Sequence, residues 1–133
     1  KVTAAHDVGR AIHPRLLAGQ VSGGVAQGVG YALMEDLRLK GGVPLNPGFT
    51  DYLIPTTLDV PPVDIVLIEE PFEQGPFGAK GIGEPALIPA PAAVANAVAD
   101  ALGHRFYTLP LTPERVLAAI SPYMSDLDLE PEV

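Results

Sequence analysis

The chain has 133 residues, 47% hydrophobic and 18% charged, which allows one domain with a modest core. Sixteen acidic residues against eight basic ones give a formal net charge of −8, which disfavours nucleic acid as a partner. Cysteine is absent, so this chain can hold no disulfide, thiolate zinc site or iron–sulfur cluster of its own. Apolar runs are too short to span a bilayer and no signal-peptide pattern opens the chain, so we expect a cytoplasmic location without membrane contact.

The beginning of the chain is predicted to form a strand and then a long helix. Residues 1–8 are rich in apolar and β-branched types and lead into a turn-like Asp-Val-Gly, which indicates a strand. Pro14 suits a first helical turn, and apolar residues then recur every three or four positions, which predicts a helix over about 14–36. The opening KVTAAHDVGR has no Met, so we expect a fragment or a processed subunit.

The long helix contains an unusual number of glycines, each of which costs roughly 1 kcal/mol relative to alanine. They lie at positions 19, 23, 24, 28 and 30. At 100° per residue, one face away from the apolar stripe collects Gln20, Gly24, Gln27 and Tyr31. Such a face allows a bulky polar ligand to approach and to receive hydrogen bonds from the glutamines. Close packing of small residues, with incidental glutamines, explains the same spacing, and the pattern leaves both readings open.

The middle of the chain has fewer organised segments. Residues 37–62 contain GG, NPG and PP and read as an irregular connection, with a short strand or hairpin around Leu37 to Lys40. VDIVLIEE, residues 63–70, is β-branched and bounded by prolines, which predicts a buried strand.

Two shorter helices are predicted near the end. One runs over about 91–102 and is capped by Gly103, and the other begins with Pro113 after the N-cap residue Thr112 and runs to about Ile120. This order of elements predicts an α+β fold in two layers, with helices packed on a small mixed sheet of three or four strands. We expect one domain over residues 1–122 with some exposed apolar surface, followed by an acidic, mobile tail at 123–133.

Residues 75–85, GPFGAKGIGEP, present a single carboxylate, Glu84, at the end of a glycine-rich loop. The spacing matches neither GxxxxGK[ST] nor GxGxxG, which excludes the two nucleotide fingerprints. Glu84 is either an exposed residue of a structural loop or a general base, and the apolar run after Pro85 favours a partly dry cleft around it. Lys80 either attracts an anionic substrate or lies in solvent, and we expect the second. The three histidines lack metal-ligand spacing, so we expect them to be solvated or packed; they are His6, His13 and His104.

Three motifs in order carry a resemblance to a known family. DVGRAIHPRLLAGQVSGGVAQGVGYALMED, then GAKGIGEPALIPAPAAVANAVADAL, then TPERV, resemble the C-terminal part of the molybdenum-binding subunit of the xanthine dehydrogenase and aldehyde oxidase family. The resemblance covers about residues 5 to 120 and is more specific than any one glycine-rich loop.

The resemblance implies roles for particular residues. Glu84 matches the family's general base beside the molybdenum, in an enzyme that hydroxylates an aldehyde or N-heterocycle with oxygen derived from water. Gln27 matches a residue that contacts the molybdopterin cofactor, and its neighbours Gly23, Gly24 and Gly28, together with Gly83 of the loop, are expected to line that group.

The resemblance also implies partners outside this chain. Most cofactor contacts, the iron–sulfur clusters and the FAD belong to other segments or subunits, so activity is expected to need the remainder of the molybdenum-binding subunit and a small-molecule substrate. The alternative is a non-catalytic assembly module that keeps the fold and docks to a larger partner.

Overall fold

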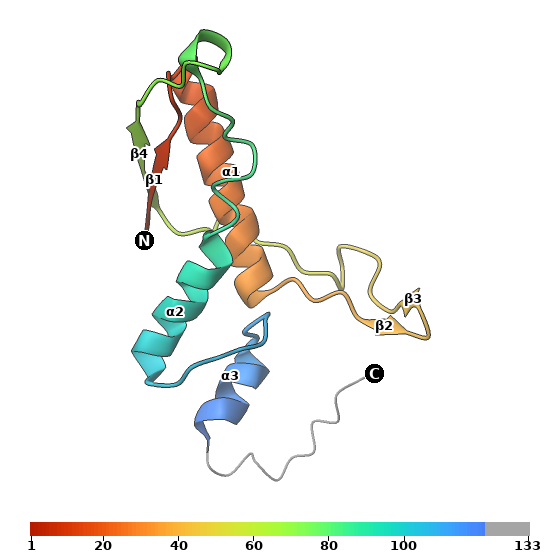
Figure 1. Cartoon of the computed structure of the whole chain (residues 1–133). Helices are drawn as coiled ribbons and strands as arrows, with labels where there is room; N and C mark the ends of the chain where they lie inside the picture. The colour runs from red at the N-terminus through yellow and green to blue at the C-terminus, as the bar shows by residue number, and fades with distance from the viewer. Residues whose placement is uncertain (122–133) are drawn as a thin grey trace. The chain divides into compact units, whose positions relative to one another are not determined.

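A computed structural model describes residues 1–121, and the predicted tail at 123–133 lies outside them. The described chain divides into two compact units, one formed by Lys1–Val29 with Pro55–Pro91 and the other by Gly30–Ile54 with the described residues from Ala92 onward. The predicted α+β fold is confirmed: three α-helices accompany two small sheets in the described residues (Figure 1).

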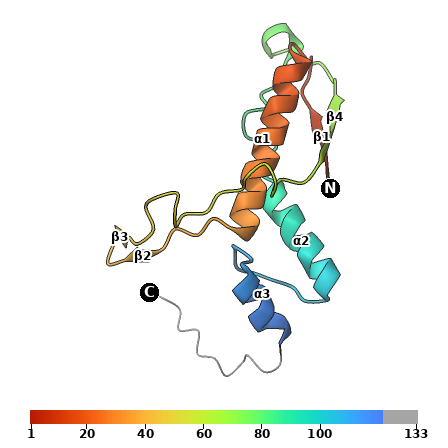
Figure 2. The same cartoon turned by 180° about the vertical axis from the view of Figure 1, so that it is seen from behind.

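The first unit is organised around a parallel pair of strands. β1 (Val2–Asp7) pairs with β4 (Val63–Ile68) along its whole length, and helix α1 (Pro14–Leu33) runs beside the pair in both views (Figures 1 and 2). The predicted strand at 1–8 and the predicted long helix are therefore confirmed. The predicted apolar stripe is also confirmed, because its valines are the buried residues of α1 in this unit, namely Val21, Val25 and Val29.

The helix α1 ends three residues before the predicted position. The amides of Met34 and Glu35 both donate to the carbonyl of Gly30, at 2.9 and 2.8 Å. These two hydrogen bonds to one carbonyl close the last turn of the helix. No sequence signal marks this end, because Gly30 itself lies inside the helix.

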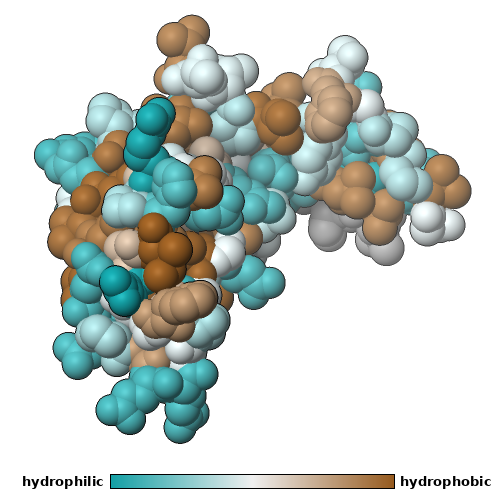
Figure 3. Space-filling model, turned by 90° about the horizontal axis from the view of Figure 1, so that it is seen from above, coloured by the Kyte–Doolittle hydropathy of each residue, from teal (hydrophilic) through white to brown (hydrophobic). Residues whose placement is uncertain are grey.

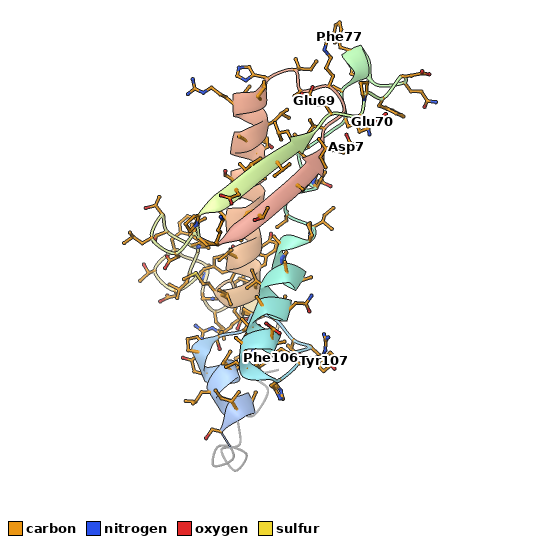
Figure 4. All side chains as sticks on the ribbon, turned by 90° about the vertical axis from the view of Figure 1, so that its left-hand side faces the viewer. Asp7, Glu69, Glu70, Phe77, Phe106 and Tyr107 are labelled. Atoms are coloured by element: carbon orange, nitrogen blue, oxygen red, sulfur yellow. The ribbon has the colours of Figure 1, made fainter. Side chains whose placement is uncertain are left out.

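The predicted burial of strand β4 is wrong for every second residue. Its side chains alternate between half-buried and exposed, and Val66 and Ile68 are 47% and 49% exposed. The strand forms as predicted, but nothing within residues 1–121 covers its outward face. The helix α1 covers only one side of the β1–β4 pair (Figure 4).

The second unit contains a small hairpin instead of further strands of the same sheet. β2 (Leu39–Lys40) pairs antiparallel with β3 (Val43–Pro44), which confirms the predicted hairpin. The buried Asn46 holds its base: its Oδ1 accepts from the Arg38 amide at 2.9 Å and its Nδ2 donates to the Asp36 carbonyl at 2.7 Å. Among residues 1–121, the four strands therefore form one parallel and one antiparallel pair, which are two separate sheets.

Both short helices agree with prediction. α2 (Ala90–Leu102) is followed by Gly103, whose φ of +65° places it in the left-handed region that glycine favours at a helix end. α3 (Pro113–Ile120) begins after Thr112, whose side-chain oxygen accepts from the Arg115 amide.

Polar contacts join the parts of the second unit to one another. The amide of the buried Leu111 donates to the Ala32 carbonyl at 2.6 Å. The Tyr52 hydroxyl donates to the Glu35 carboxylate at 2.7 Å, and this bond raises the pKa of Tyr52 to about 12.

Apolar side chains also reach the surface of the chain, as predicted. Phe77 is 82% exposed, Leu58 95% and Tyr107 90%. Hydrophobic residues lie among hydrophilic ones across the face seen in Figure 3. No helix within residues 1–121 has both the length and the apolar character needed to cross a membrane.

Candidate functional site

The segment that follows Glu84 lies directly on the glycine-rich face of α1. A Cβ added at Gly24 would lie 2.7 Å from the Cβ of Ala86 and 2.9 Å from the Leu87 amide nitrogen. A Cβ added at Gly28 would collide with the Cβ of Ala90. Ala86 and Ala90 are 2% and 8% exposed, so these contacts belong to the core of the first unit.

These contacts explain why α1 tolerates the helix-propensity cost of two of its glycines. Close approach needs a position without a side chain on α1, because no larger residue fits against Ala86 or Ala90. The packing reading of the glycine face is therefore correct at Gly24 and Gly28. Their predicted role beside a cofactor stays a prediction.

Other glycines have no such explanation within the chain. Within residues 1–121, a Cβ added at Gly19 or Gly23 of α1, or at Gly81 or Gly83 of the loop, would meet no packing neighbour within 4 Å. None of the four has a positive φ. Packing and backbone conformation within residues 1–121 therefore do not require glycine at these positions. Gly81 and Gly83 lie three residues and one residue before Glu84 in the sequence.

Glu84 is exposed, so the expectation of a partly dry cleft around it is wrong for the residues that the structure describes. The apolar run after it buries Ala86 and Ala90 against α1 and leaves the carboxylate outside. The Glu84 carbonyl accepts from the Leu87 amide at 2.9 Å and from the Ile88 amide at 3.4 Å, which makes the turn that leads into α2.

The backbone around Glu84 is nevertheless well anchored. Ile82, two residues before it, is 8% exposed, and Ala86, two residues after it, is 2% exposed. Because the chain is fixed on both sides, the exposed carboxylate projects from a loop that is held at two close points. A base that acts on a bound substrate needs such positioning.

The structure places Gln27 on the exposed surface of α1, one turn after Gly23 and immediately before Gly28. Gln27 is therefore next in sequence to Gly28, one of the two positions at which residues 86–90 pack against α1. Of the predicted site residues, the structure brings Gly24 and Gly28 together with the segment that carries Gly83 and Glu84.

Two of the three histidines make local contacts. His13 Nδ1 accepts from the Leu16 amide at 3.3 Å in the first turn of α1, and the His104 ring packs edge-on against Phe106 with centroids 5.0 Å apart. Within residues 1–121, no group of three or more histidines and carboxylates is arranged to hold a metal ion.

An ion pair that the sequence does not predict fixes the base of the loop. Lys80, expected in solvent, instead binds Asp7 at the end of β1. The Lys80 amide donates to the Val8 carbonyl at 3.0 Å, and this backbone contact brings the lysine side chain to Asp7. The Gly9 amide also donates to Asp7 at 2.9 Å. The Asp-x-Gly spacing is the signal that could have identified Asp7 as a turn-forming acceptor.

Hydrogen bonding from Lys80, and then from the Gly9 amide, holds the pKa of Asp7 below its ordinary value of 3.8. Glu69 and Glu70 lie at the same end of the strand pair (Figure 4), and the Glu69 carboxylate accepts from the Ala11 amide at 2.8 Å.

We expect Asp7→Asn to lower the urea midpoint of unfolding at pH 7. Because the pKa of Asp7 is depressed in the folded state, its contribution is present above about pH 4 and is lost as the pH falls through the folded pKa. The urea midpoints of the unsubstituted chain and of Asp7→Asn, measured from pH 7 to pH 2.5, should therefore converge at the acid end. Asp51→Asn, at an exposed position whose side chain makes no hydrogen bond or ion pair within residues 1–121, is the control. An equal offset at every pH would contradict the linkage.

Comparison with known proteins gives the family. Residues 1–61 match the family described as molybdopterin cofactor-binding domain. The chain is 42% identical over 118 residues to the xanthine dehydrogenase molybdenum-binding subunit of Escherichia coli O157:H7, covering 87% of this chain and 16% of that protein. It is 46% identical over 123 residues to the nicotine 6-hydroxylase large subunit of Paenarthrobacter nicotinovorans, covering 90% of this chain and 15% of that one.

Solved structures agree. Quinoline 2-oxidoreductase from Pseudomonas putida 86 superposes with a TM-score of 0.84 at 45% identity, over 89% of this chain and 16% of that chain. The chain thus spans about one sixth of the length of the proteins that it matches. Agreement of sequence, fold and motif order over nearly the whole described chain shows that it belongs to the xanthine dehydrogenase and aldehyde oxidase family, as part of the molybdopterin-binding subunit.

Proposed function

We propose that this chain supplies the general base and part of the cofactor-facing wall of a molybdenum hydroxylase, with Glu84 as the base. The enzyme would hydroxylate an aldehyde or an N-heterocycle with oxygen derived from water. Relatives named for nicotine, quinoline and aldehyde oxidation support this substrate range. The observation that carries the proposal is the exposed carboxylate of Glu84 on a loop anchored at Ile82 and Ala86.

The open glycines fit a bulky group close to the backbone. Gly23 on α1 and Gly81 and Gly83 before Glu84 have free space where a side chain would stand. Packing among residues 1–121 does not require glycine at these three positions. Gln27 lies one turn along α1 from Gly23 and offers an amide that both donates and accepts hydrogen bonds. These residues would hold the edge of a molybdopterin, which when bound supplies the two-electron redox chemistry of the reaction.

The chain's own contribution to the chemistry is proton transfer. A deprotonated Glu84 accepts a proton from the oxygen nucleophile as that oxygen attacks the electron-poor carbon of the substrate. The carboxylate is exposed in this chain, so the walls that exclude water from it belong to the remainder of the subunit. The chain alone is therefore proposed to be inactive.

Further partners follow from the same proposal. Electrons leave through iron–sulfur clusters and FAD, which we assign to other domains or subunits because this chain has no cysteine to ligate a cluster. The cytoplasmic location expected from the sequence stays a prediction.

A second candidate function is a non-catalytic assembly module that keeps the fold and docks to a larger partner. The exposed apolar side chains favour a docking role, since 21 large hydrophobic residues are exposed within the described chain. An assembly module would have these surfaces without any need for the carboxylate at position 84.

Isotope labelling of the full-length enzyme tests the proposal. Turnover of an aldehyde or N-heterocycle in H₂¹⁸O should place ¹⁸O in the product, and metal analysis should find molybdenum in the purified complex. The 133-residue chain by itself should show neither activity nor stoichiometric molybdenum. A purified complex that holds molybdenum but takes its oxygen from O₂ would refute the proposed chemistry.

A further inference from the structure

Strand β4 has one edge whose backbone groups have no strand partner among the described residues. The Val2 amide donates to the Pro62 carbonyl and the Val8 amide donates to the Ile68 carbonyl, both at 2.9 Å. In the parallel register of β1 and β4, the backbone groups of alternate residues point to opposite sides. The even-numbered residues of β4 therefore face β1, whereas the amides and carbonyls of Val63, Ile65 and Leu67 face away from it.

The free edge lacks the features that protect a natural sheet edge. Edge strands are usually short, interrupted by proline, bulged, or charged with lysine. β4 has six residues in regular register, no proline and no bulge. Its one charge, Asp64, is already paired with Lys1. The remaining five residues are all β-branched or apolar, as in a strand from the interior of a sheet.

The faces of the pair point to the same conclusion. Parallel strands occur almost only in sheets that are covered on both faces, and a two-stranded ribbon is marginal by itself. Here α1 lies on one side of the pair (Figure 4), while Val66 and Ile68 remain about half exposed on the other. The β1–β4 pair thus has the composition of a buried sheet without the neighbours of one.

We propose that β4 is an interior strand of a larger sheet, and that a strand from the remainder of the molybdenum-binding subunit pairs with its free edge through Val63, Ile65 and Leu67. The occupant is assigned to the same subunit because the chain spans only 16% of the length of a related one. This inference rests on the proposed function only in taking the chain as part of that subunit.

Residue-resolved amide hydrogen exchange on the full-length subunit tests the pairing. The amides of Ile65 and Leu67 should exchange as slowly as those of Val66 and Ile68, within roughly tenfold, because all four would then be hydrogen-bonded. Exchange at Ile65 and Leu67 faster by more than about a hundredfold would overturn the proposal. Protection that disappears on dilution would also overturn it, since the partner strand would then come from a second copy.

Proline substitution separates hydrogen bonding from simple burial. Proline is tolerated at an edge where the amide faces solvent but not where the amide serves a ladder. Ile65→Pro should lower the thermal midpoint of the full-length subunit well below that of Ile65→Ala, the control for lost side-chain packing. Equal midpoints for these two variants, with Val66→Pro strongly destabilised, would show that the sheet ends at β4. Neither readout needs molybdenum or turnover, so a failed activity assay leaves this test intact.

Discussion

Replacing Glu84 by glutamine in the full-length enzyme is expected to lower kcat by about 10²- to 10⁴-fold while molybdenum stays bound. Glutamine keeps the size of the side chain and one acceptor oxygen, but it does not accept a proton at neutral pH. The residue is exposed and its neighbours Ile82 and Ala86 provide the anchoring, so the fold should not change. Steady-state kinetics and metal analysis on the same preparation check both parts.

Glu73→Gln is the matched control for this substitution. Glu73 is also an exposed glutamate in the segment between β4 and α2, so its replacement makes the same change in charge and size. We expect kcat within about twofold of the unsubstituted enzyme, because surface substitutions away from a site have small effects. Full activity in Glu84→Gln would remove the general base from the proposal and favour the assembly module. Loss of molybdenum together with activity would instead place Glu84 in cofactor retention.

The second large effect is expected at the contact between α1 and the segment that carries Glu84. Gly28→Ala should destabilise the folded chain by about 1–3 kcal/mol, the usual range for overpacking in a core. The added methyl group would collide with Ala90, a buried residue at the start of α2. Urea unfolding followed by circular dichroism measures the change in the free energy of unfolding.

Gly23→Ala is the control on the same helix. Its added Cβ has no packing neighbour within 4 Å in the part of the chain that the structure describes, so the usual helix propensity should apply and stabilise the chain by up to about 1 kcal/mol. The two substitutions add the same atoms, and their opposite signs would isolate the packing contact. Equal effects would refute it.

The same Gly23→Ala variant examines the proposed cofactor wall. In the full-length enzyme it should reduce molybdenum content without lowering stability, because the added methyl group would occupy space that we assign to the cofactor. Unchanged molybdenum content would remove Gly23 from that wall.

Local sequence signals were sufficient where each element is determined by its own residues. Thr112 and Pro113 start α3, Gly103 follows the end of α2, and the spacing of three and four identifies the buried stripe of α1. These signals succeed because capping, backbone conformation and helical periodicity act over a few residues. The family resemblance was equally readable, since it depends on the order of motifs and needs no contacts.

Contacts between distant segments were not readable in the same way. The Lys80–Asp7 pair joins residues 73 positions apart, and the sequence offered no reason to remove Lys80 from solvent. The burial of Ala86 and the exposure of Glu84 likewise depend on which side of the loop faces α1. An apolar run indicates that something nearby is buried, but not which of its neighbours is.

The sequence by itself determined the α+β elements, the family and the candidate base Glu84. Only the tertiary structure decided that Gly24 and Gly28 serve packing while Gly23, Gly81 and Gly83 remain open. It also decided that the strands form two separate pairs and that β4 keeps a free edge. The physical reason is that glycines permit a close neighbour and β-branched residues favour a strand, but neither identifies the neighbour. The segment that packs or pairs there comes from elsewhere in the chain.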